Sequence, residues 1–444
     1  MKLASALVAL FSASPASSYS PPSCQAVADD YCAKNCLDSA SLQARSCDGP
    51  MVALESGPGE SKRRCYSPST LSGGDATAYE AGDCYCTRDA ELSSLLKQCE
   101  RDMEIETVFA AGMDNAACYR IPSIIMTPDG ALLAFAEQRE KDCGDNGTNN
   151  IVVRRKEKGG VWGEIRMVAK ADGQAYSNAN PAIVYDAAGG WSVLLHYDTM
   201  NNPSSSRVGA NMQTWSEDGG KTWSEAADIT GFMPDASKGC MPGPSIGVQN
   251  NVPGHAEEGR VYFNCHSGNA GGNAGGNHIA YWSDDLGATW EASEPLGSNF
   301  NECSIALLPS SNSSLLLNCR TNAGDPDLDD GKARAEMLLE GGSLAGDAFY
   351  PAGLDDPGCA GSIVSRKGAE GEDVVLLSNA VGPGRSNLRV KTSVDSGRTF
   401  DDGVLVWDGP AAYSMLVDGG DFVGVFFELG ADSPYESMGF AVVA

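Results

Sequence analysis

Basic side chains are scarce in this sequence. It contains 31 Lys and Arg against 59 Asp and Glu, which gives a formal charge of −28 over 444 residues. A surface with this charge repels polyanions, so DNA and anionic membrane faces are poor partners for it. We therefore expect no nucleic-acid partner.

Histidine is rarer still. The four His residues lack the His-x-x-x-His spacing of a helical metal site. The Gly-rich stretch at 269–277 has no following helix pattern and no Lys-Ser/Thr pair, so it indicates a loop and not a phosphate cradle. The stretch GPSIG at 243–247 matches G-x-S-x-G but lacks the strand-turn-helix context of a hydrolase nucleophile. We expect neither a metal nor another cofactor.

Long apolar runs are also absent. The N-terminal sequence MKLASALVALFSASPASS has one Lys, an apolar run from Leu3 to Phe11, and small residues around Ala16. This run is too short to cross a bilayer and has the form of a cleaved secretory signal, which we place at residues 1–20. No later run is long enough for an anchor, and the C-terminus carries no retention tetrapeptide. We expect a protein without a membrane span, secreted to the extracellular space or the lumen of the secretory pathway.

Cysteine is abundant and unevenly placed. Eight of the fifteen Cys precede residue 100, in a segment at 21–104 that has few large apolar residues. Such a segment cannot hold itself together by burial, so we predict a small disulfide-rich module; a zinc module is the alternative, although neither a His nor a CxxC pair occurs there. The seven later Cys are an odd number, so at least one is free or pairs across domains.

From residue 105 to 444 the sequence alternates apolar runs with Gly/Asp/Pro turns, as in SIIMTPDGALLAFAE. This pattern predicts antiparallel strands, and the single helix candidate, DAELSSLLKQCE at 89–100, precedes it. Within the β region the frame Ser-x-Asp-x-Gly-x-Thr-aromatic occurs at Ser216, Ser283 and Ser393. An incomplete copy without the Asp, KEKGGVW, ends at Trp162. In such a turn the Ser and Asp oxygens accept backbone amides, Gly takes positive φ and the aromatic ring is an anchor.

The spacing of these turns predicts the architecture. Their final aromatic residues lie at 162, 223, 290 and 400, at intervals of 61, 67 and 110. A unit of roughly 55 to 65 residues, repeated over the β region, gives about six units of the four-stranded kind found in propellers. We predict an all-β chain: a six-bladed β-propeller at 105–444, preceded by the disulfide-rich module.

These features together resemble the exo-α-sialidases, which remove terminal sialic acid from glycans. The resemblance rests on YRIP at 119–122, on the repeated turns, known in that family as Asp-boxes, and on a Glu, two further Arg and a late Tyr in the family's order. It covers about residues 105 to 444. It implies a six-bladed propeller, sialylated glycans as substrates, and hydrolysis with retention through a tyrosyl-enzyme intermediate.

Three arginines correspond to the family triad that binds the sialic acid carboxylate. They are Arg120 of YRIP, Arg320 and Arg385, with Arg389 as the alternative to the third. A planar guanidinium binds a carboxylate through two hydrogen bonds and keeps its charge, which suits this task. Arg139 matches a further arginine that lines the family's sugar pocket.

The catalytic residues are also implied by the resemblance. Tyr413 matches the nucleophile and Glu302 the base that activates it. The loop AEQREKDCGDNGTNN offers Asp145 as the acid/base residue, with Asp142 as the alternative. A sequon at Asn146 adjoins this loop residue, and a second lies at Asn312.

Other functions use the same residues or the same fold. A sialoside-binding, lectin-like propeller or a structural propeller would keep the turns, and the presence of Tyr413, Glu302 and Asp145 favours the enzyme. A trans-sialidase and a hydrolase for the deaminated sugar acid are expected to use the same residues.

Overall fold

The computed structural model describes residues 103–443, apart from 146, 203–206, 233–239, 267–277, 298–299, 311–313, 322–333, 352–353, 355 and 369. Before residue 103 it describes one small sheet, in which β3 (Cys84–Thr87) lies between β1 (Met51–Ala53) and β2 (Ala78–Ala81). The predicted signal peptide, the helix at 89–100, the cross-links of the early Cys and both sequon asparagines lie outside the described residues. The residues from Glu104 onward form a compact unit of their own.

The first large sheet of this unit contains two antiparallel meanders. Its strands are β5 (Cys118–Met126), β6 (Leu132–Arg139), β7 (Asn149–Lys156), β8 (Arg166–Ala169), β9 (Ala175–Tyr185), β10 (Trp191–Asn202), β11 (Arg207–Ser216) and β12 (Ala227–Asp228). The two groups of four strands are joined through a single parallel pair between β7 and β9. Two short 3-10 helices, η2 (Met113–Asn115) and η3 (Thr230–Phe232), lie in the connections.

Two smaller sheets follow in chain order. In the first, β13 (Met241–Pro242) and β14 (Val248–Gln249) both pair with β15 (Val261–His266), followed by β16 (His278–Ser283) and β17 (Glu291–Ala292). The second is β18 (Phe300–Leu308), β19 (Ser314–Thr321), β20 (Arg334–Glu340) and β21 (Ser343–Leu344). All their pairings are antiparallel.

The last sheet joins the two ends of the β region. It contains β22 (Ser362–Lys367), β23 (Asp373–Ala380), β24 (Ser386–Ser393), β25 (Val404–Asp418), β26 (Val423–Leu429) and β27 (Ser437–Val442), and its outermost strand is β4 (Ile105–Ala110). The long strand β25 pairs with β24 through its first half and with β26 through its second half. The strand that begins the unit therefore pairs with the strand that ends it.

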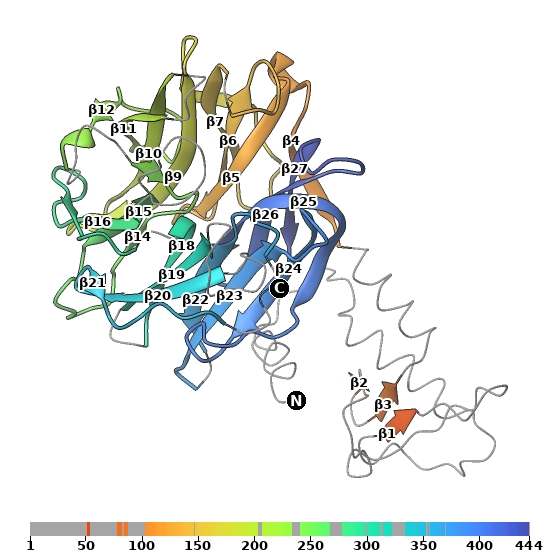
Figure 1. Cartoon of the computed structure of the whole chain (residues 1–444). Coiled ribbons are helices and arrows are strands. Elements are labelled where there is room, and N and C mark those ends of the chain that lie inside the picture. Colours follow the sequence, from red (N-terminus) through yellow and green to blue (C-terminus); the bar gives the residue numbers. More distant parts are fainter. Residues whose placement is uncertain are drawn as a thin grey trace. The chain divides into compact units, whose positions relative to one another are not determined.

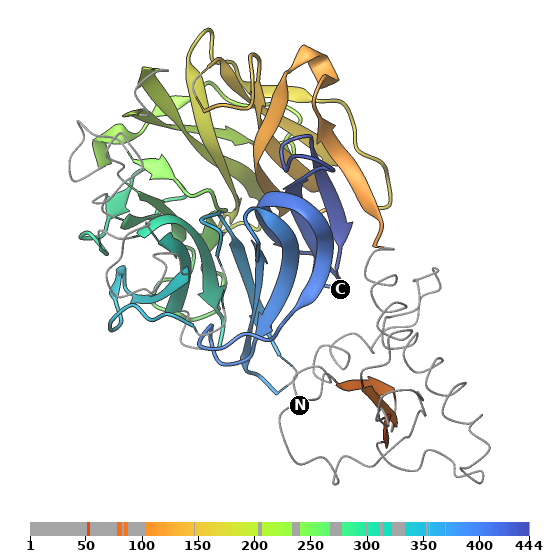
Figure 2. The ribbon, with the colours of Figure 1, turned by 45° about the vertical axis from the view of Figure 1, so that its right-hand side comes forward.

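The four sheets of the unit from Glu104 onward lie around a common centre (Figures 1 and 2). Their inner strands contact one another in a closed cycle, β5 with β9, β9 with β14, β14 with β18, β18 with β22, β22 with β25, and β25 with β5. Apolar side chains fill the spaces between neighbouring sheets, and one cluster joins β4 and β27 to β5 and β6 through Phe109, Phe440, Ile124 and Ala134. The expectation of an all-β chain is confirmed.

The repeated turns have the predicted geometry. In the first, Asp218 accepts the amides of Lys221 and Thr222 at 2.9 Å each and the Thr222 hydroxyl at 2.6 Å. Gly220 has φ 84°, and a Cβ there would lie 2.9 Å from the end of the buried Leu133 side chain, so a larger residue would be strained. Trp223 packs against the buried cluster between the two meanders of the first large sheet. The turns are structural, as the sequence indicated.

Three disulfides link the later cysteines: Cys118–Cys143, Cys240–Cys265 and Cys303–Cys319. Cys359 is buried and free, which is the first of the two alternatives expected for the odd cysteine. Among the described residues, no helix has the length and apolar character needed to cross a bilayer.

Candidate active site

Arg120 is held by a buried carboxylate on a strand that is far from it in the sequence. The Glu428 side chain on β26 accepts hydrogen bonds from Arg120 Nε at 3.0 Å and Nη2 at 3.3 Å. It also accepts the amides of Ile121 and Tyr413, each at 3.0 Å. Ile121 has a positive φ of 58°, and the β5–β6 register shifts between residues 120 and 123. Glu428 therefore fixes both the Arg120 guanidinium and the backbone at Tyr413.

Arg139 and Asp145 lie on the other side of Arg120. Asp145 Oδ1 is 2.9 Å from Arg139 Nη1 and 3.6 Å from Arg120 Nη1. The Asp145 side chain is 70% exposed, whereas Arg139 is buried and also bonded to Glu137. This places an accessible carboxyl group at the edge of a fixed positive cluster.

Asp142, the alternative to Asp145, does not contact this cluster. Its Oδ1 accepts the Gly144 amide at 2.7 Å, as in an ordinary loop turn. The Cys118–Cys143 disulfide ties the loop to β5, two residues from Arg120. The structure thus brings Asp145, and not Asp142, next to the arginines.

Tyr413 donates its hydroxyl hydrogen bond to Glu302 Oε1. The other oxygen, Glu302 Oε2, lies 2.7 Å from Arg320 Nη1, and the same nitrogen is 3.4 Å from the Tyr413 hydroxyl. The three residues come from β25, β18 and β19. A phenol that donates a hydrogen bond to a carboxylate beside a guanidinium can act as a nucleophile, because the carboxylate is placed to take its proton as a base.

The surroundings of Tyr413 and Glu302 shift the pKa values of these two groups in opposite directions. Burial raises the pKa of Tyr413 well above its usual value, and the negative charge of Glu302 adds to this effect against the opposing arginines. Burial alone would raise the pKa of Glu302, but Arg320 and the Tyr413 hydroxyl bond outweigh it and the pKa is lowered. At neutral pH Glu302 is therefore a carboxylate and Tyr413 a neutral phenol.

Arg385 completes the cluster from the loop before β24. Its Cζ lies 5.2 Å from the centre of the Tyr413 ring, as does that of Arg120. Its nitrogens donate to the Tyr435 hydroxyl at 2.7 Å and to the Gly358 carbonyl at 3.0 Å. The alternative, Arg389, donates instead to the carbonyls of residues 402 and 403.

The structure thus brings all seven predicted site residues together around Tyr413 and Asp145. Sequence reasoning missed three supporting residues, Glu137, Glu428 and Tyr435. Glu137 accepts Arg139, the Ser177 hydroxyl and the Asn178 amide, and the Tyr435 ring lies 4.3 Å from Arg120 Cζ. The one available signal was a lone acid in an apolar run, as in VGVFFELG for Glu428.

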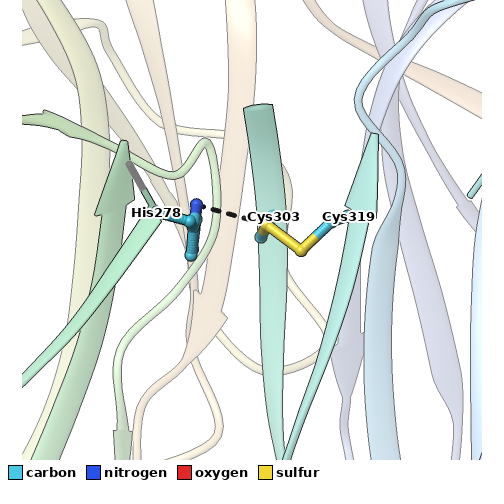
Figure 3. Close-up of side chains that lie close together, drawn as sticks. All are labelled: His278, Cys303 and Cys319. Carbon is cyan, nitrogen blue, oxygen red and sulfur yellow. Dashed lines mark hydrogen bonds between the residues drawn. A yellow bond between two sulfur atoms is a disulfide. The ribbon is translucent and has the colours of Figure 1, made fainter. Parts of the chain in front are cut away.

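One group among the described residues has the spacing of metal ligands. The potential ligand atoms of His278, Cys303 and Cys319 lie within 4.8 Å of one another (Figure 3). The two sulfurs are joined in a disulfide, and thiolates are the form that binds metals. In this state the group does not offer a metal site.

Comparison with known proteins gives relatives of one kind. The family model described as "BNR repeat-like domain" matches residues 130–425. A sialidase of Micromonospora viridifaciens is 29% identical over 352 residues, covering 74% of this chain and 53% of that protein. An exo-alpha-sialidase of Aspergillus fumigatus is 26% identical over 344 residues, covering 68% of this chain and 76% of that protein. The chain thus matches about half the length of the first relative.

Solved structures agree in fold. A Hadza microbial sialidase superposes with a TM-score of 0.62 at 23% identity, over 76% of this chain and 68% of that one. A leech intramolecular trans-sialidase superposes with a TM-score of 0.61 at 17% identity, over 81% of this chain and 72% of that one. At these identities the likeness concerns the fold.

Proposed function

This chain belongs to the family described as BNR repeat-like domain, and from that premise we propose that it is an exo-α-sialidase, a glycoside hydrolase acting on terminal α-ketosidically linked sialic acids of glycoconjugates. The observation that carries the proposal is the bond from Tyr413 to Glu302 within a cluster of three guanidinium groups. Sialidases are the glycosidases that use Tyr as nucleophile. The relatives that are named sialidases support the same activity.

The three arginines bind the carboxylate of the sugar. Arg120 and Arg320 are each already paired with a protein carboxylate, which fixes their positions. Arg385 has no carboxylate partner among the described residues, so its charge is available to the ligand. A fixed guanidinium loses little side-chain entropy when it binds.

The first step forms a glycosyl-enzyme. Glu302 takes the phenolic proton of Tyr413 as the phenol oxygen bonds to the anomeric carbon. Asp145 gives a proton to the glycosidic oxygen, and the bond from that oxygen to the anomeric carbon breaks. A neutral phenol avoids the repulsion that a carboxylate nucleophile would meet beside the sugar's own carboxylate.

The second step releases the sugar. Asp145, now ionised, takes a proton from water, and the water oxygen bonds to the anomeric carbon on the face that the aglycone left. The bond to Tyr413 breaks and Glu302 returns the proton to the phenolate. Two displacements at one carbon give net retention.

The test is release of a fluorescent aglycone from an α-ketoside of sialic acid, measured with chelator present. We expect turnover by the full chain, and a loss of at least about a thousandfold in kcat for Tyr413→Phe. The variant keeps the arginines and so keeps saturable binding of the free sugar. Turnover by Tyr413→Phe at the wild-type rate would show that another group is the nucleophile.

The other functions give different results in the same assay. Saturable binding without turnover by the wild type would indicate a lectin-like propeller. Neither binding nor turnover would mean that the arginines serve another anion or the fold alone. Transfer to added lactose, instead of release of the free sugar, would identify a trans-sialidase, and a faster reaction with the deaminated sugar acid would identify its hydrolase.

We propose further that the unit from Glu104 onward is a six-bladed propeller. Six groups of antiparallel strands can be assigned if β25 is divided between the last two groups: five groups have four strands, and the third has five because β13 and β14 both pair with β15. The closed cycle of inner strands supports this count. Pairing of β4 with β27 would then close the last blade, since radial repetition leaves only short, protected edges.

We also propose that the chain is exported. Three disulfides among the described residues support an oxidising compartment. The N-terminal sequence and the early cysteines agree with cleavage of a signal and with a cross-linked module at 21–104. In that compartment the sequons at Asn146 and Asn312 would be accessible to glycosylation.

A further inference from the structure

The Cys303–Cys319 disulfide lies directly beside the proposed base. Cys303 on β18 and Cys319 on β19 are register partners, with Cα atoms 4.0 Å apart. Glu302 immediately precedes Cys303, and Arg320 immediately follows Cys319. Since the strands are antiparallel, both charged residues lie at the same end of the disulfide.

The ladder between β18 and β19 is irregular at this end. Pairing is regular up to Cys303 and is found again at Phe300, and between them residues 301–302 face Arg320 alone. Two residues opposite one form a β-bulge, which leaves a residue unpaired and re-aims its side chain. Backbone pairing alone therefore does not fix the position of Glu302 relative to Arg320.

The disulfide lies on the core side of the two strands. Both cysteines are fully buried, in the apolar cluster that also contains Ile305 and Leu317. Side chains alternate along a strand, so Glu302 has the opposite direction and reaches Tyr413. The disulfide therefore joins the two strands next to the bulge, on the side opposite to the Glu302 side chain.

A histidine on the neighbouring sheet packs against the disulfide. His278 Nδ1 on β16 lies 3.3 Å from Cys303 Sγ (Figure 3). Burial lowers the pKa of His278 to about 3, so the ring is neutral at neutral pH and can remain in this core. The strands β16, β18 and β19 are therefore connected immediately behind Glu302.

We propose that the Cys303–Cys319 disulfide is a positioning element of this site, which holds Glu302 and Arg320 at the bulge so that both reach the Tyr413 hydroxyl. The inference rests on the function proposed for the site. Glu302 must receive the phenolic proton through one oxygen while the other stays 2.7 Å from Arg320. A displacement of about 1 Å in such an arrangement can cost on the order of a hundredfold in rate.

The test compares two disulfide deletions in the full chain. Cys303→Ala/Cys319→Ala removes the proposed positioning link, and Cys240→Ala/Cys265→Ala removes a buried disulfide with no contact to Tyr413. Both variants should have a lower Tm, and kinetics are measured below both values. We expect kcat of the first variant to fall at least tenfold with KM within about threefold, because Arg120 and Arg385 still bind the substrate.

The pH profile separates positioning from general loosening. Arg320 contributes to the lowered pKa of Glu302, so loss of this contact should move the acid limb of kcat to higher pH in the first variant. The control should keep kcat within about twofold and move the limb less than the first variant does, since His266, next to Cys265, contributes less to the lowered pKa of Glu302 than Arg320 does. Equal kcat values with an unchanged limb in both variants would overturn the proposal.

Crystal structures of both variants give a readout that needs no activity. We expect the separation of Glu302 Oε2 and Arg320 Nη1 to exceed 4 Å, or the two side chains to lose a single conformation, only in Cys303→Ala/Cys319→Ala. A separation still near 2.7 Å in that variant would refute the positioning role. Absence of turnover by the wild type would refute the proposed function instead, and the separation would still decide the positioning role.

Discussion

Arg385 differs from the other arginines of the site in the kind of partner that it has. Arg120, Arg139 and Arg320 each pair with a protein carboxylate, whereas Arg385 donates to a phenol and a backbone carbonyl. Its charge is therefore not neutralised by a neighbouring acid among the described residues. At the scale of single residues, this is the guanidinium from which a bound carboxylate gains most.

We predict that Arg385→Lys lowers kcat/KM by about 10- to 100-fold, mainly through KM, because an ammonium cannot bind a carboxylate through two parallel hydrogen bonds. Arg389→Lys is the matched control. Arg389 donates to the carbonyls of residues 402 and 403, so kcat/KM of this variant should stay within about twofold. Steady-state kinetics on the same α-ketoside measure kcat/KM of both variants. Equal losses in both would contradict the assignment of Arg385 to the sugar carboxylate.

The loop between β6 and β7 is the element that carries the proposed acid. Cys118–Cys143 ties it to β5, and the Cys143 carbonyl accepts Arg139 Nη1 at 2.5 Å. Asp145, two residues further along, is mostly exposed and reaches the arginines only through this loop. The position of the acid therefore depends on the tether and not on local burial.

We predict that Cys118→Ala/Cys143→Ala lowers kcat/KM for alkyl sialosides about tenfold or more but leaves kcat/KM for aryl sialosides of low leaving-group pKa nearly unchanged, because kcat/KM reports the first step, in which only the alkyl leaving groups need the acid. Loss of a link across 25 positions should also lower stability by about 3 kcal/mol. Rates on both substrate types and a denaturant titration measure the two effects. A uniform loss on both types would show that the tether does not serve the acid.

At the scale of the whole molecule, buried ionisable groups set how stability depends on pH. Burial lowers the pKa of His196 and His278 to about 3 and that of His266 to about 4. Below about pH 6.5 the unfolded chain binds protons that these buried rings do not, so stability falls as the pH falls toward those values. Burial raises the pKa of Glu336 to about 8 and that of Asp198 well above its usual value. Folded protein keeps these two protons that the unfolded chain releases above about pH 4.5, so their contribution to stability is lost as the pH rises.

We predict a stability maximum near pH 6 to 6.5. Below that range, the protons that the three histidines take up in the unfolded chain outnumber the two that the carboxyl groups keep in the folded chain, so stability falls as the pH falls. Above it only the two carboxyl groups act, and stability falls as the pH rises. Calorimetric Tm values from pH 4.5 to 8.5 measure this. Glu336→Gln should flatten the decline between about pH 6.5 and 8, because it removes one of the two groups. A Tm that rises steadily to pH 8.5 would contradict the prediction.

Local features of the fold were predictable because they depend on neighbours in the chain. The turn at Asp218 is closed by residues within four positions of it, and the frame that makes those bonds is visible in the sequence. Strand alternation likewise identified the all-β class. The family order of motifs pointed to Arg120, Glu302 and Tyr413, which the structure brings together.

The sequence by itself determined the β-strands, the repeated turns and the types of residue at the site, since short-range hydrogen bonding and side-chain chemistry decide these. Only the tertiary structure decided that Arg385 and not Arg389 lies over the Tyr413 ring, that Asp145 and not Asp142 lies beside Arg120 and Arg139, and which cysteines pair. It alone revealed Glu428, which holds Arg120 across 308 positions of sequence. The physical reason is that these choices depend on which side chains a closed ring of sheets brings within hydrogen-bond distance, and separation along the chain carries no information about that.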